Sequence, residues 1–130
     1  MALLTVQNED ELVLGVPTYV NPTTPLGDTF INTGQEGIWV NNQTISIIKL
    51  VINSVDSNFG SYPEKVMQIG AGDTKLGLRM DGRRFNDDYG QVSFLMTDNS
   101  GASATVPGAV LTNMSNVWVA VVRYRTWFKD

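Results

Sequence analysis

Short apolar segments recur along the whole chain, and glycine, proline, asparagine, aspartate and serine separate them. In most of these segments apolar residues alternate with polar ones, as in strands that bury one face. We find no segment in which apolar residues recur at helical spacing over the length of a helix. The pattern predicts an all-β protein, a jelly-roll-like antiparallel β-sandwich of about eight or nine strands.

The expected strands are the segments that carry this pattern most clearly. They cover residues 11–16, 28–30, 38–40, 44–53, 66–69, 75–80, 91–97 and 117–126. Segment 44–53 is apolar on both faces except at Ser46 and Lys49, so we expect it to be central or covered on both sides. Trp39 and Trp118 lie inside apolar segments, and we expect them in the core. A flexible stretch is expected over residues 98–104.

Length and composition predict one domain over residues 1–130. Of the 130 residues 42% are hydrophobic and 17% are charged, which suits a single compact core. Residues 1–10 form a possible N-terminal arm, because residues 2–6 are mostly apolar. This arm could add a strand to the sheet of a neighbouring molecule, or it could pair within its own sheet.

Missing residue types restrict the chemistry. Cysteine and histidine are absent, which excludes disulfides, Ser-His and Cys-His catalytic pairs, and the commonest zinc ligands. Nine basic against 13 acidic residues give a net charge of −4, which disfavours nucleic-acid binding. We expect no enzyme activity, no cofactor and no nucleic-acid or membrane partner. Acids at positions 9–11 are unlike a secretory signal, so we expect synthesis in a cytoplasm.

The densest acidic cluster consists of Asp81, Asp87 and Asp88. Carboxylate oxygens suit calcium, but the spacing differs from that of an EF-hand loop. We favour a structural turn in which Asn86 and Asp87 bond to their own backbone. A hydrolase with a pair of catalytic carboxylates, such as Asp87 and Asp88, is an alternative of another class.

The C-terminal segment combines aromatic and basic residues. They are Arg123, Tyr124, Arg125, Trp127, Phe128 and Lys129. Tyrosine, tryptophan and arginine dominate the energetic hot spots of protein interfaces. We predict a protein interface that includes Leu3, Leu4, Tyr124, Trp127 and Phe128. A platform for stacking sugars and packing on the domain's own edge are the alternatives.

Several short elements occur in a recognisable order. They are Pro-Thr-Tyr at 17–19, Gly-Asp-Thr-Phe-Ile-Asn-Thr-Gly at 27–34, Phe-Asn-Asp-Asp-Tyr-Gly-Gln-Val at 85–92 and Val-Trp-Val-Ala-Val-Val at 117–122. This order resembles that of small structural proteins of tailed-bacteriophage heads, the capsid decoration or cement proteins. Two features depart from the family pattern: the region 98–116 is longer, and the tail from Arg123 adds aromatic and basic residues.

The resemblance implies a non-enzymatic protein that binds the outer surface of the capsid shell and stabilises it. The implied partners are the major capsid protein and further copies of the chain, often as a homotrimer, and the implied location is the exterior of the virion. The family has no catalytic residues to carry over. A carbohydrate- or receptor-binding module of a phage tail fibre is the alternative function.

Overall fold

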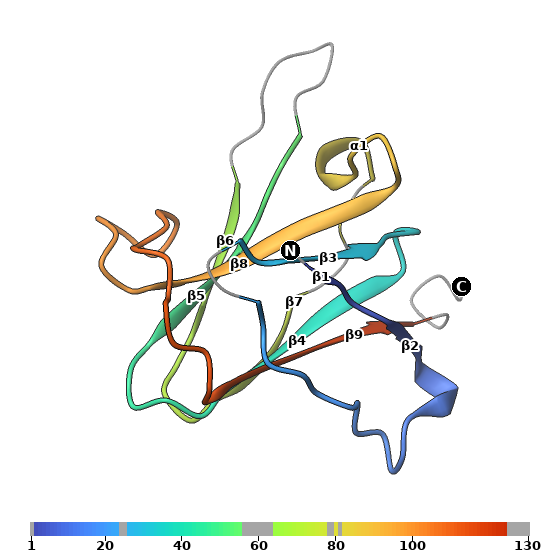
Figure 1. Cartoon of the computed structure of the whole chain (residues 1–130), viewed down its shortest axis with the longest axis horizontal. Coiled ribbons are helices and arrows are strands. Elements are labelled where there is room, and N and C mark those ends of the chain that lie inside the picture. Colours follow the sequence, from blue (N-terminus) through green and yellow to red (C-terminus); the bar gives the residue numbers. More distant parts are fainter. Residues whose placement is uncertain (1, 24–25, 56–63, 78–79, 81, 125–130) are drawn as a thin grey trace.

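A computed structural model describes residues 2–23, 26–55, 64–77, 80 and 82–124, and this part of the chain forms nine strands (Figure 1). The strands are β1 (Ala2–Leu3), β2 (Val6–Asn8), β3 (Asp28–Ile31), β4 (Glu36–Asn42), β5 (Ile48–Ile52), β6 (Lys65–Ile69), β7 (Thr74–Gly77), β8 (Gln91–Asp98) and β9 (Val117–Arg123). A 3-10 turn, η1 (Glu9–Glu11), and a four-residue helix, α1 (Gly82–Phe85), complete the described elements.

The strands form two sheets that pack as a sandwich. Sheet A has the order β1-β3-β8-β5-β6, and sheet B has the order β2-β9-β4-β7. All pairings are antiparallel except those of the N-terminal segment, where β1 lies parallel to β3 and β2 parallel to β9. The prediction of an all-β sandwich is confirmed.

Strand alternation builds the core between the sheets. In sheet B the inward positions include Ile38 and Val40 of β4 and Val119 of β9, all 0% exposed. Sheet A contributes Phe30 and Phe94, whose ring centroids lie 6.1 Å apart. Each such side chain stabilises the fold by roughly 1.5–3 kcal/mol when it leaves water.

The N-terminal segment connects the two sheets at one edge of the sandwich. β1 extends sheet A beside β3, and β2 extends sheet B beside β9 only a few residues later. Leu4 and Val6 pack against the core from this edge. Of the two alternatives for residues 2–6, pairing within the chain's own sheets is therefore the one observed.

β5 is buried on both faces, as the sequence predicted. All five of its residues are buried, including Lys49, which is 1% exposed. The Lys49 ammonium group donates hydrogen bonds to the carbonyl oxygens of Ser103 at 2.9 Å and Val106 at 2.7 Å. The loop that carries these carbonyls, drawn in orange on the left of Figure 1, thus covers the outer face of sheet A.

We predict that Lys49→Met destabilises the protein by about 1–3 kcal/mol, because two loop carbonyls lose their donor. Residues 99–106 should also become easier to cleave in limited proteolysis. Urea unfolding measures the first effect, and protease mapping measures the second. Lys75→Met is the matched control, because Lys75 is exposed and donates to the Gln68 carbonyl at 3.0 Å. Equal stability of both variants would contradict the assigned role of Lys49.

The strand expected over residues 11–16 is wrong. These residues form the end of η1 and a tight turn in which the Val16 N–H donates to the Val13 carbonyl at 3.0 Å. Leu14, within this turn, is 97% exposed. The blue segment that carries the turn projects at the bottom of Figure 1. The apolar residues do alternate in this segment, but a strand also needs a free sheet edge. The edge of β9 already pairs with β2 and with Val20.

The strand expected over residues 44–53 begins only at Ile48. A turn at residues 44–46 separates β4 from β5, and the Asn42 side-chain amide holds this turn. It donates to the Ser46 carbonyl and accepts from the Thr44 N–H. Ile45 is consequently 98% exposed. The buried asparagine at the end of β4 determines where the next strand begins.

The prediction of core positions for Trp39 and Trp118 is also wrong. Because Ile38, Val40, Val117 and Val119 face the core, their strand neighbours must face outward. Both tryptophans are half-buried on the outer face of sheet B, and the Trp39 indole N–H donates to the Tyr124 hydroxyl.

Candidate interaction surface

A groove lies between the N-terminal segment and residues 18–20. Its volume is about 540 Å³, and its lining includes Leu3, Leu4, Glu11, Thr18, Val20 and Ala120. We call it the N-terminal groove. Ala120 belongs to β9 of sheet B, whereas Leu3 belongs to β1 of sheet A, so the groove lies where the N-terminal segment joins the two sheets.

Hydrogen bonds fix residues 18–21, which form the wall of the N-terminal groove opposite the N-terminal segment. The Gln7 side-chain amide pairs with the Thr18 backbone through two bonds of 2.8 Å, in the manner of a strand neighbour. Val20 exchanges two backbone hydrogen bonds with Val119, of 2.9 and 2.8 Å. The Asn21 side chain donates to the carbonyls of Met114 and Val117, both at 2.9 Å. Thr18 therefore lies beside β2, and residues 20–21 follow the edge of β9 beyond the end of its pairing with β2.

Apolar side chains are exposed on both sides of residues 3–4. Leu3 is 57% exposed and Val20 is 44% exposed in the N-terminal groove. A second hollow, of about 250 Å³, is lined by Leu3, Leu4, Ile31 and Arg123 among others, and Ile31 is 49% exposed. Clustered exposed apolar groups are typical of surfaces that bind another molecule.

Acidic groups adjoin the N-terminal groove. Glu11 lines it, and Glu9 and Asp10 precede Glu11 in η1. The Asn8 side chain donates to the Glu11 carboxylate at 2.5 Å and so restrains it beside the groove. The groove thus combines apolar walls with negative charge, which favours a ligand that is apolar and basic.

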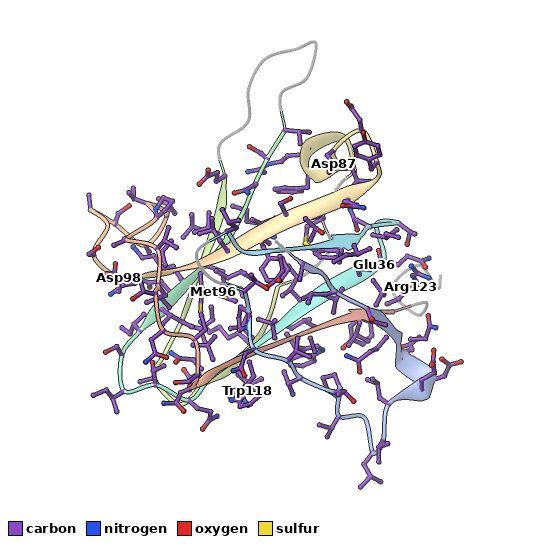
Figure 2. The ribbon with its side chains drawn as sticks, viewed as in Figure 1. Glu36, Asp87, Met96, Asp98, Trp118 and Arg123 are labelled. Atoms are coloured by element: carbon purple, nitrogen blue, oxygen red, sulfur yellow. The ribbon has the colours of Figure 1, made fainter. Side chains whose placement is uncertain are left out.

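An ion pair between Arg123 and the buried carboxylate of Glu36 secures the end of β9 near the second hollow. Arg123 donates to the Glu36 carboxylate at 2.6 Å, and the two side chains meet in Figure 2. The carboxylate also accepts the N–H groups of Thr33 at 2.7 Å and Gln35 at 3.1 Å. Burial alone would raise the pKa of Glu36, but hydrogen bonds from Arg123 and Thr33 outweigh it and hold the pKa below its ordinary value of 4.5.

This ion pair predicts a pH-dependent loss of stability. Because the pKa of Glu36 is lowered on folding, its stabilisation is complete above pH 4.5 and is lost as the pH falls through the folded-state pKa. The difference in free energy of unfolding between the wild type and Glu36→Gln should therefore shrink in acid. Urea unfolding at a series of pH values measures it, and a difference that stays constant with pH would contradict the prediction.

The predicted interface residues do not all meet in one place. Leu3 and Leu4 line both hollows. Tyr124 is half-buried and bonds to Trp39, and it is absent from the lining of both. Trp127 and Phe128 lie outside the described residues. The sequence did not predict Thr18, Val20 and Ala120 as lining residues, because their small or apolar side chains do not indicate a binding surface by themselves.

The acidic turn has the structural role that we favoured for Asp87. Its carboxylate accepts the N–H groups of Tyr89 at 2.8 Å and Gln91 at 3.0 Å. Asn86 differs from the expectation, because its side chain pairs with Asn32 and not with its own turn. Asp81 lies outside the described residues. Within the described part of the chain, no group of three potential metal-ligating side chains occurs.

The motif at residues 27–34 also has a structural explanation. Asp28 is buried and accepts the Thr23 N–H at 2.9 Å. Phe30 lies in the core, and Asn32 donates to the Met80 carbonyl at 2.7 Å. Gly34 adopts a φ of 89°, which favours glycine. Asp28 thus holds the segment before β3, and Asn32 and Gly34 shape the β3–β4 connection.

Comparison of this chain with protein-family models, curated proteins and solved structures finds no match. No helix in the described ranges is long and apolar enough to cross a membrane.

Proposed function

We propose that this chain is a non-enzymatic phage structural protein that binds the outer surface of an assembled capsid shell and stabilises it. Its partners are the major capsid protein and further copies of itself, as a homotrimer on the exterior of the virion. The observation that supports this proposal is the exposure of Leu3, Val20 and Ile31 around the two hollows. The order of sequence elements adds the resemblance to decoration proteins.

In this proposed function the protein stabilises the shell by binding alone, with no catalysed reaction. A protein that binds neighbouring capsomers stabilises the assembled shell, because it binds that state and not the separated subunits. Repeated copies on a symmetric lattice multiply weak contacts. The backbone pairing of residues 2–8 with both sheets suits this task, since it presents Leu3 and Leu4 from a fixed part of the fold.

Shell stability tests the proposal. Shells assembled with the protein should survive heat and osmotic shock better than shells without it. Leu3→Asp should reduce this protection, because it places a charge in the exposed apolar surface. Ile45→Asp is the matched control, since Ile45 is 98% exposed and belongs to neither hollow. Equal survival of shells with and without the protein would refute the stabilising role.

A second candidate function is carbohydrate or receptor binding by a module of a tail fibre. It is favoured by the half-buried aromatic side chains of Trp39, Trp118 and Tyr124, which all lie on β4, β9 or the residue that follows β9. Aromatic faces exposed on a sheet can stack on sugar rings. A glycan array should then give hits that Trp118→Ala abolishes, whereas an array without hits would count against this function.

A further inference from the structure

We propose that the N-terminal groove binds the C-terminal segment, residues 125–130, of a second copy of this chain. This inference rests on the self-association part of the proposed function. It assigns a role to the aromatic and basic segment that the sequence places after β9.

The groove and the segment match in chemistry. Leu3, Leu4 and Val20 offer apolar contact, and Glu11 places a carboxylate in the same lining. Residues 125–130 read Arg-Thr-Trp-Phe-Lys-Asp, so an aromatic pair lies between two basic residues. Large aromatic side chains are the residues that most often anchor an interface in a pocket. Basic side chains beside them would meet the acidic residues of η1, and opposite charges at an interface steer association and fix register.

The direction of β9 favours a neighbouring molecule as the owner of the bound segment. β9 runs from Val117 to Arg123, so the chain passes Ala120 in the groove before it reaches Tyr124. The Tyr124 N–H donates to the Gln35 carbonyl at 2.9 Å, so the last described residue still lies beside the start of β4. Residues 125–130 span at most about 20 Å when extended, and a reversal toward Ala120 would use part of that length.

A segment of one copy that enters the groove of the next makes a head-to-tail contact. Such contacts form a closed ring when the rotation between copies closes, and a trimer is one such ring. The proposed contact is therefore compatible with a homotrimer, whereas a symmetric two-fold contact would not be.

Cysteine cross-linking tests the contact directly, because the chain has no cysteine of its own. One full-length variant carries Thr18→Cys in the groove, and another carries Asp130→Cys. When the two are mixed and oxidised, a disulfide-linked heterodimer should form. Ile45→Cys replaces Thr18→Cys in the matched control and should give little heterodimer, since Ile45 lies outside the groove. Equal yields from both mixtures would overturn the proposal.

A charge exchange supplies a second readout that does not depend on cross-linking. Glu11→Lys should weaken self-association in sedimentation velocity by about two- to fivefold, as expected for an interfacial ion pair at a rim. Lys129→Glu should do the same, and the double variant should recover much of the loss. Asp88→Lys, an exposed charge outside the groove lining, should have little effect. Additive losses in the double variant would overturn the pairing.

The outcomes separate this inference from the proposed function. Phe128→Ala should lower the association constant by more than about tenfold if Phe128 anchors the contact. Oligomers that persist unchanged in Phe128→Ala, with shell protection also intact, would refute the groove contact and leave shell binding standing. If the cross-link forms but the wild-type protein does not protect shells, the groove contact stands and the proposed shell binding is refuted.

Discussion

Glu36→Ala is expected to lower the free energy of unfolding by about 3 kcal/mol or more, because it removes a buried carboxylate that accepts hydrogen bonds from three residues. Glu36 is 0% exposed and accepts hydrogen bonds from Thr33, Gln35 and Arg123. Arg123 retains 30% side-chain exposure and can be hydrated in part once the carboxylate is gone, so the ion pair accounts for only part of the cost.

Urea unfolding at neutral pH measures this effect. Glu11→Ala is the control, since Glu11 is exposed and its replacement should change stability by no more than about 0.5 kcal/mol. Glu36→Gln should fall between the two, because the amide oxygen can still accept one of the backbone bonds. A loss below about 1 kcal/mol for Glu36→Ala would show that the β3–β4 turn does not depend on this carboxylate.

Gly27→Ala is expected to be the most damaging replacement of a glycine in the described chain. Gly27 has a φ of 80°, and an added Cβ would lie 2.1 Å from the carbonyl oxygen of Phe94 and 2.9 Å from Cβ of Leu95. β3 and β8 would have to separate at the point where Asp28 pairs with Phe94. Backbone strain of about 1–2 kcal/mol and overpacking of about 1–3 kcal/mol should add.

Gly72→Ala measures the backbone strain without the steric overlap. Gly72 has a φ of 76°, close to that of Gly27, but a Cβ there would meet nothing within 4 Å. Its cost should therefore be the strain alone, about 1–2 kcal/mol. Thermal and urea unfolding of both variants measure the difference, and equal losses would show that β3 can move away from β8 without cost.

Strands with strong local patterns were predictable from the sequence. Alternation identifies β8, and the short apolar runs identify β4 and β9. The two-sided apolar pattern of β5 correctly indicates that both of its faces are covered. The same local logic fails at residues 11–16, because a segment with the pattern of a strand still needs an unoccupied sheet edge. It also fails at Trp39, whose outward position depends on which of two apolar faces the partner sheet covers.

The groove was not predictable, because long-range contacts create it. The pairing of the Gln7 side chain with the Thr18 backbone, and of Val20 with Val119, joins segments that carry no distinctive motif. Leu3 and Leu4 were identified from their hydrophobicity alone, and the structure places them in the lining. The outward face of a strand and the path of a loop depend on the whole fold, and local composition does not encode them.

The parallel alignment of β2 and β9 has a mechanical consequence. The two strands lie near opposite ends of the chain and run side by side in the same direction, with Val6 opposite Val121 and Asn8 opposite Arg123. A force that pulls the two chain ends apart therefore acts along the strands and loads their hydrogen bonds together in shear, where an antiparallel hairpin would unzip bond by bond. Tension applied through the termini should meet its main resistance at this pair, which a force–extension trace would record as one cooperative rupture.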